Sequence, residues 1–144
     1  MTTLLAGNEI AQLISQSLPG SVVESGKAWV VVLAEDVPKV VGFLKNEQSY
    51  DYLTDLTSVD YQDYFEVVYR LSSLGKNSML ALKVRCYDRQ NPTVPSITGL
   101  FRGADLMERE IYDLMGIKFS GHPNLERLFL WEGFQGHPLR KDYL

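Results

Sequence analysis

The chain has few of the residues from which cofactor sites are built. Its 144 residues include one cysteine, Cys86, and two histidines, His122 and His137. A single cysteine forms no intrachain disulfide, which suits a reducing compartment, and an ordinary iron–sulfur cluster needs four thiolates. Two histidines fall short of the usual ligand count of a metal site. We therefore expect no metal and no cluster in this chain, and we interpret Cys86 as a small buried hydrophobic residue.

Long apolar runs and an excess of positive charge are also missing. The longest apolar stretch, Ala28 to Ala34, has seven residues, whereas a membrane-spanning helix needs roughly 20. The N-terminus lacks a positive region and reaches an acid at Glu9, which is not typical of a signal peptide. A net charge of −4 gives no electrostatic reason to bind nucleic acid or anionic lipid. The sequence predicts no direct membrane insertion and no nucleic-acid partner.

Common nucleotide-binding and hydrolase motifs do not occur either. Gly116 and Gly121 have the spacing of a Walker A loop, but His122 and Pro123 occupy the places of its lysine and hydroxyl residue. Neither G-x-G-x-x-G nor G-x-S-x-G is found. The two Gly-His-Pro segments are interpreted as rigid corners whose imidazole rings bond a neighbour.

The residues that are present predict one α+β domain. Apolar residues make up 45% of the chain, which is typical of a globular protein. Turn residues divide the chain into an order α-β-β-α-β-β-β-α, which favours a mainly antiparallel sheet with helices packed on it. Helices are expected over residues 8–18, 36–46 and 105–115, strands over 22–23, 28–33, 53–59, 65–71 and 79–87, and an irregular loop over 88–95.

The third predicted helix is unusually rich in charge. Asp105 and Glu108 have capping-box spacing, and the helix is expected to end at Gly116. Three interpretations are open for its charged residues: general acid–base chemistry, a solvated face, or recognition of a partner. They concern Glu108, Arg109, Glu110 and Asp113.

Residues 120–144 differ in kind from the rest. This segment has no period of 2 or 3.6, yet it contains many large apolar residues, which disordered tails usually lack. We therefore divide the chain into an α+β domain, residues 1–119, and an extended C-terminal tail, residues 120–144, that docks on a partner. The large residues are Leu125, Leu128, Phe129, Leu130, Trp131, Phe134, Leu139 and Tyr143.

Two blocks near the C-terminus resemble one protein family. Residues 108–123 read EREIYDLMGIKFSGHP, and residues 136–143 read GHPLRKDY. With Tyr52–Asp60 and Phe65–Leu71, these blocks resemble the 30 kDa-type (C) subunit of respiratory complex I, the proton-pumping NADH:quinone oxidoreductase. The resemblance implies structural and assembly roles for Glu108, Arg109, Glu110, Asp113, Gly116, His122, Pro123 and Arg127 in the first block, and for His137, Pro138, Arg140, Lys141 and Asp142 in the second.

The resemblance also implies partners and a location. Members of this family are cofactor-free subunits of the hydrophilic arm, which lie against the 49 kDa-type (D) subunit and support the cluster-bearing subunits. It implies that iron–sulfur clusters and FMN belong to partner subunits and that this chain has no catalytic residue. The expected location is peripheral, on the cytoplasmic face of the cell membrane.

Three departures from the family pattern leave alternatives open. Leu106 stands where a tryptophan is usual, Glu126 replaces an arginine, and Gly133-Phe134 replaces an Asp-Trp pair. The alternative is an equivalent subunit of a related membrane-bound hydrogenase or F420H2 dehydrogenase, although Gly-His-Pro in the second block favours the NADH-type enzyme. A stand-alone small enzyme would use Glu108, Glu110 and His122 as acid, base and orienting group, whereas a free-standing binding module would have an ordered tail.

Overall fold

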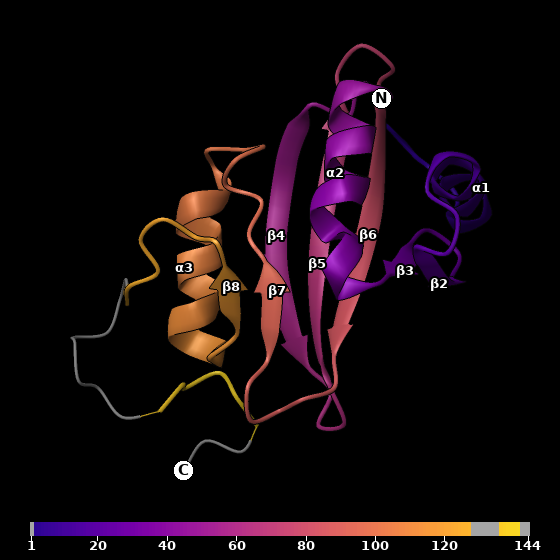
Figure 1. The fold of residues 1–144 in the computed structure, drawn as a ribbon. Coiled ribbons are helices and arrows are strands. Elements are labelled where there is room, and N and C mark those ends of the chain that lie inside the picture. The colour runs from indigo at the N-terminus through magenta and orange to yellow at the C-terminus, as the bar shows by residue number, and fades with distance from the viewer. Residues whose placement is uncertain (1, 128–135, 142–144) are drawn as a thin grey trace.

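The computed structural model describes residues 2–127 and 136–141, and its α+β architecture confirms the predicted fold class (Figure 1). Its elements in chain order are β1 (Thr3–Leu4), α1 (Gly7–Ser17), β2 (Val22–Ser25), β3 (Val30–Val32), a 3₁₀ turn η1 (Ala34–Asp36), α2 (Val37–Asn46), β4 (Tyr52–Asp60), β5 (Phe65–Ser73), β6 (Ser78–Cys86), β7 (Thr93–Pro95), α3 (Ala104–Met115) and β8 (Lys118–Ser120).

The main sheet has the strand order β2-β3-β6-β5-β4, and β1 also pairs with β6. Strands β4, β5 and β6 form an antiparallel meander, and β2 and β3 form an antiparallel pair. Strands β1 and β3 both run parallel to β6, along successive stretches of it. The sheet is therefore mainly antiparallel, as predicted.

The core lies between the helices and one face of this sheet. Figure 1 shows α2 across the face formed by β5 and β6, α1 beside β2 and β3, and α3 with β8 beyond β4. Phe65, Val67, Tyr69 and Leu71 of β5 lie on the core side, as predicted. They pack among apolar residues of β6, α1 and α2. The fully buried members include Phe65, Val67, Tyr69, Leu71, Leu80, Leu82, Val84, Ile10, Ile14, Val40, Val41 and Leu44.

Cys86 faces inward at the end of β6 and is buried, as predicted. Burial raises the pKa of its thiol to about 11, which makes the thiolate scarce at neutral pH. Among the described residues, no helix is both long enough and apolar enough to cross a membrane.

Three short strands and one helix start differ from prediction. Strands β1, β7 and β8 have two or three residues each, too few to produce a visible period of 2. The segment 88–95 is therefore not irregular throughout, since β7 lies within it and pairs with β8. Gly103, not Asp105, occupies the N-cap of α3, so the predicted capping box is wrong.

Candidate functional site

The two sequence blocks meet at the C-terminal end of α3. The first block forms most of the helix and continues to Arg127, and residues 136–141 of the second block lie against the last helical turn. The helix stops at Gly116, whose φ of 77° is the left-handed conformation of a helix C-cap. A helix end leaves its last four carbonyl oxygens without partners inside the helix. In this chain the two blocks supply most of those partners.

Asp113 is the centre of this arrangement. Its carbonyl oxygen accepts hydrogen bonds from Arg127 Nη2 at 2.7 Å and from His137 Nδ1 at 3.0 Å. Its carboxylate is fully buried and pairs with Arg127 Nε. Arg127 Nη2 also donates to the Gly136 carbonyl oxygen at 2.8 Å. Arg127 therefore joins the end of α3 to the start of the second block.

The other carbonyl oxygens of the last turn are occupied as well. Gly116 N–H donates to Tyr112 O at 2.9 Å, Leu139 N–H to Leu114 O at 2.9 Å, and Arg140 Nε to Met115 O at 2.6 Å. Cations near a helix C-terminus are favoured by the helix dipole, and Arg127 and Arg140 both lie there. The second block thus caps α3, and we name residues 113–116, 127 and 136–141 the α3 cap.

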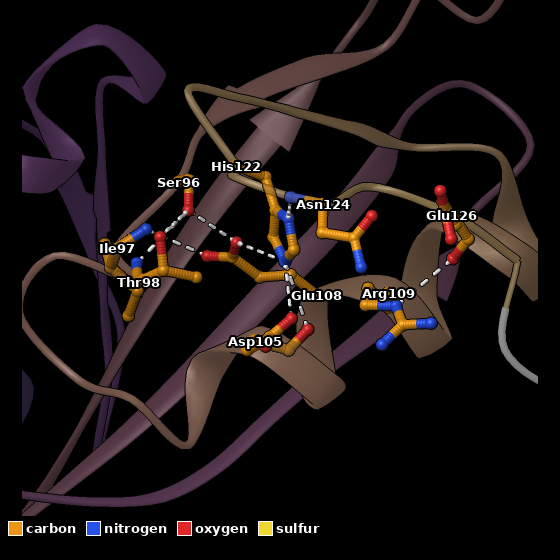
Figure 2. A network of polar contacts seen from close by, with 9 residues as sticks. All are labelled: Ser96, Ile97, Thr98, Asp105, Glu108, Arg109, His122, Asn124 and Glu126. Carbon is orange, nitrogen blue, oxygen red and sulfur yellow. Dashed lines mark hydrogen bonds and ion pairs between the residues drawn. The ribbon is translucent and has the colours of Figure 1, made fainter.

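A second polar cluster lies near the start of α3 (Figure 2). The Glu108 side chain is fully buried and points toward the loop that follows β7. One carboxylate oxygen accepts a hydrogen bond from Ser96 Oγ at 2.7 Å, and the other accepts one from Ile97 N–H at 2.9 Å. Glu108 therefore fastens the loop between β7 and α3 to the helix.

His122 reaches the same cluster from the segment after β8, and its imidazole ring is completely buried. Its Nδ1 accepts a hydrogen bond from Asn124 N–H at 2.9 Å, so the ring proton lies on Nε2. Nε2 lies 3.2 Å from the Asp105 carbonyl oxygen, 3.1 Å from Asp105 Oδ1 and 4.0 Å from Glu108 Oε1. His137, whose Nδ1 faces a carbonyl oxygen, has the opposite tautomer.

A third site ties the second block to the main sheet. Asp60, at the end of β4, is only 4% exposed. Its carboxylate accepts two hydrogen bonds from the Arg89 guanidinium, at 2.7 and 3.0 Å, and one each from Gln62 N–H at 2.8 Å and Lys141 N–H at 2.9 Å. These bonds, Arg89 foremost, hold the pKa of Asp60 well below its usual range despite the opposing effect of burial.

The geometry does not assemble an acid–base pair. Glu108 and His122 come together, but the Glu108 carboxylate has no exposed surface, and Glu110 is exposed and lines a groove between α3 and β4. The interpretation of a wholly solvated charged face is wrong for Glu108 and Asp113, which are fully buried, and fits Glu110. Within residues 2–127 and 136–141, no three His, Cys, Asp or Glu side chains are grouped to hold a metal ion.

Comparison with known proteins shows the family to which a chain with these two blocks belongs. Residues 30–144 match the family described as "Respiratory-chain NADH dehydrogenase, 30 Kd subunit". The chain belongs to this family. It is 44% identical over 116 residues to the C-type subunit of NADH-quinone oxidoreductase from Moorella thermoacetica, a match that covers 79% of this chain and 78% of the relative. It is 42% identical over 142 residues to the corresponding subunit of Roseiflexus sp., covering 92% and 81%.

A solved structure has the same fold at low sequence identity. It is described as the membrane-bound sulfane sulfur reductase, an archaeal respiratory membrane complex, and one of its chains superposes with a TM-score of 0.78. The match covers 94% of this chain and 84% of that chain at 19% identity. This likeness concerns the fold alone.

The family-motif residues divide into groups by position. Asp113, Gly116, Arg127, His137, Arg140 and Lys141 contribute to the α3 cap, and Glu108 and His122 form the buried cluster at the helix start. Arg109 Nε donates to the Glu126 carbonyl oxygen at 3.4 Å, and Glu110 and Pro123 are exposed. Pro138 is half-buried beside His137, and Asp142 lies outside the described residues.

The sequence did not reveal which residues form hydrogen bonds with the motif residues. Asp60, which Arg89 holds in place, accepts a hydrogen bond from Lys141 N–H. Ser96 and Ile97 donate hydrogen bonds to Glu108. An aspartate ending a predicted strand gives no sign of burial, and Arg89 is separated from Asp60 by β5 and β6. Of the positions that depart from the family pattern, Leu106 is 57% exposed and Glu126 is exposed, whereas Gly133 lies outside the described residues.

Gly116→Ala is expected to destabilise the chain more than Gly20→Ala. Both glycines have a positive φ, 77° and 87°, which costs a residue with a Cβ about 1–2 kcal/mol. A Cβ on Gly116 would lie 2.7 Å from His137 Cδ2, whereas a Cβ on Gly20 meets nothing within 4 Å. Urea unfolding of the two variants therefore isolates the crowding between α3 and the second block. Equal losses in both variants would contradict a close contact at His137.

Glu108→Gln is expected to flatten the dependence of stability on pH. Burial raises the pKa of Glu108 above its ordinary value of 4.5, and the bonds from Ser96 and Ile97 oppose this shift. Above pH 4.5 the folded chain then binds more protons at Glu108 than the unfolded chain, so stability falls as pH rises through the raised pKa. Urea unfolding between pH 5 and about 8 measures the slope. An unchanged slope in the glutamine variant would contradict a raised pKa.

Proposed function

We propose that this chain is a cofactor-free structural subunit in the peripheral arm of a proton-translocating NADH:quinone oxidoreductase. In this role it supports assembly and keeps the cluster-bearing subunits in position while electrons pass from NADH to quinone. The observation that carries the proposal is the family match over residues 30–144. Relatives at 44% and 42% identity, each named as the C-type subunit of NADH-quinone oxidoreductase, support the same enzyme.

The contacts of the motif side chains support a structural role over a catalytic one. Glu108 and Asp113 are buried and bonded, and Arg127 and Arg140 bind carbonyl oxygens of the chain itself. A catalytic acid or base must reach the proton that it transfers. Charged groups fixed in this way set the shape of the surface that a partner meets.

The proposal assigns partners, cofactors and a location. The partners are the 49 kDa-type (D) subunit and the cluster-bearing subunits, and the iron–sulfur clusters and FMN belong to those subunits. The chain lies at the cytoplasmic face of the cell membrane and attaches through its partners. We assign docking on the partners to residues 120–144. Within this segment, Arg127 bonds Asp113 of α3 and the Lys141 N–H bonds Asp60.

Affinity purification tests this function. The chain, tagged at its N-terminus, is expressed at its natural level, and solubilised membranes are purified on the tag. Mass spectrometry is expected to find a D-type subunit and cluster-bearing subunits, and NADH oxidation by quinone is expected to be lost in a deletion strain and restored by the tagged chain. Recovery of the chain alone, or stoichiometric flavin or metal in the isolated chain, would refute the proposal.

A related respiratory complex is the second candidate, because the chain shares its fold with a chain of the sulfane sulfur reductase complex. The higher identity to the NADH-quinone oxidoreductase subunits favours the NADH enzyme. The donor distinguishes the two candidates. Membranes of the deletion strain should lose oxidation of NADH, and unchanged NADH oxidation with loss of another donor's oxidation would indicate the related complex.

A further inference from the structure

An aromatic and aliphatic surface lies at the end of the main sheet where β4 turns into β5. The strand register places the β4–β5 turn beside the end of β6, because Asp60 pairs with Phe65 and Phe65 pairs with Cys86. Strand β3 reaches the same end, since Val31 lies opposite Lys83 of β6. Three segments distant in sequence therefore present side chains on one surface.

Three tyrosine rings form a row on this surface. Tyr61 and Tyr64 have ring centroids 5.4 Å apart, and Tyr64 and Tyr87 have centroids 5.3 Å apart. Tyr61 is 45% exposed and Tyr87 is 66% exposed, so the row is open to solvent at both ends. The guanidinium of Arg85 lies 5.0 Å above the Tyr64 ring, which holds that ring in one orientation.

A pocket continues the row toward β2 and β3. Tyr87 and Arg85 line it together with Val23, Leu33 and Glu35. Val23 is 56% exposed and Leu33 is 38% exposed, so its apolar walls face solvent. Contiguous exposed apolar surface marks interaction sites, whereas single exposed residues do not. Tyrosine and arginine are also the residue types enriched at binding hot spots.

Exposed carboxylates accompany these residues. Asp63 precedes Tyr64, Asp88 follows Tyr87, and Glu35 lines the pocket itself, whereas Glu24, which follows Val23, is paired with Arg85. The nearby cations are engaged: Arg85 bonds Glu24 and Glu66, and Arg89 bonds Asp60. The surface therefore combines an apolar centre with an acidic rim.

We propose that the surface formed by Val23, Leu33, Tyr61, Tyr64, Arg85 and Tyr87 docks a partner polypeptide through an apolar side chain flanked by lysine or arginine. The apolar side chain fills the pocket between Leu33 and Tyr87, and the basic residues meet the acidic rim. Charge complementarity selects such a partner over an acidic one. The inference deepens the proposed function, because it assumes that the chain is a subunit of a larger complex.

Two matched pairs of variants test this surface in the full chain. Tyr87→Ala removes the ring at the end of the row that lines the pocket. Tyr52→Ala is its control, because Tyr52 is 55% exposed at the opposite end of β4. Val23→Asp places a charge in the pocket wall, and Leu74→Asp is its control on the exposed turn between β5 and β6. We expect Tyr87→Ala to weaken association with the partner subunits about tenfold, and Val23→Asp to weaken it more. Both controls should assemble as the unaltered chain does.

Charge reversal tests the rim separately. Glu35→Lys is expected to lower incorporation into the membrane complex, and the difference from the unaltered chain should shrink at high salt, because screening weakens rim charges. Asp51→Lys, at an exposed residue before β4, is the control. Circular dichroism and urea unfolding of each variant show that the fold is retained. Full incorporation of folded Tyr87→Ala, Val23→Asp and Glu35→Lys chains would overturn the proposal.

A photo-crosslinking amino acid at position 87 identifies what covers the surface. In membranes with the assembled complex, we expect a crosslink to a partner-subunit peptide in which an apolar residue is flanked by lysine or arginine. A crosslink to an acidic peptide, or only to this chain, would overturn the inference even if the chain copurifies with the complex. Failure of the unaltered chain to copurify with any subunit would instead overturn the proposed function.

Discussion

Asp113→Asn is expected to lower the free energy of unfolding by about 3 kcal/mol, because removal of one partner from a buried ion pair leaves the other charge uncompensated. The Asp113 side chain has no exposed surface, and Arg127 is only 14% exposed. The change also weakens the link between α3 and the second block, because Arg127 bonds Asp113 and Gly136 together. Urea unfolding measures the first effect, and amide exchange at Leu139 measures the second.

The matched control for this prediction lies on the same helix. Glu110→Gln also neutralises an acid of α3, but Glu110 is exposed, so the change in stability should stay within about 0.5 kcal/mol. A double-mutant cycle of Asp113→Asn with Arg127→Met should give a coupling energy above about 1 kcal/mol. Equal effects of the Asp113 and Glu110 variants would show that the buried pair contributes little.

The sequence predicts the main elements of this fold because their periods are long enough to read. Strand β6 alternates between buried and half-buried residues over nine positions, and α3 carries its apolar stripe over about three turns. Strands β7 and β8 have three residues each and pair with each other across the intervening helix α3. The parallel pairing of β1 and β3 with β6 cannot be predicted from the local sequence, because tertiary packing decides which strands pair.

The motif residues could be recognised from the sequence, but their partners could not. A charge pattern on a helix is equally compatible with a solvated face and with burial, and only the tertiary structure shows that Glu108 and Asp113 are buried. The two Gly-His-Pro segments look alike, yet His122 bonds Asp105 near the start of α3 and His137 bonds Asp113 at its end. The two Gly-His-Pro segments therefore bind opposite ends of α3.

Buried acidic residues near both ends of α3 have a consequence for assembly. Replacing buried ion pairs by apolar residues often leaves stability unchanged or improves it, so such pairs are weak evidence for stability. Here the same charged residues also form hydrogen bonds that join separate segments. Glu108 joins α3 to residues 96–97, Arg127 joins α3 to Gly136, and Asp60 joins β4 to Lys141. Directional bonds of this kind fix the path of residues 136–141. Under the proposed function, these residues form part of the surface that a partner subunit meets.

Asp60→Asn tests the contact between β4 and Lys141. We expect this change to lower the free energy of unfolding by about 3 kcal/mol at neutral pH. The variant removes the charge to which both terminal nitrogens of the Arg89 guanidinium donate. It should also increase hydrogen exchange at the Lys141 amide. The depressed pKa of Asp60 means that the unfolded chain binds more protons than the folded chain below about pH 4, so its contribution is lost as pH falls through that range.

The difference between the unaltered chain and Asp60→Asn should therefore shrink as the pH is lowered from 7 toward 3, in urea unfolding curves recorded at each pH. Asp51→Asn, at an exposed aspartate close to the start of β4, should show no such deficit at any pH. A deficit that stays constant with pH would mean that the Asp60 carboxylate is not held ionised in the folded chain. Unchanged exchange at Lys141 would mean that other contacts hold the second block against the sheet.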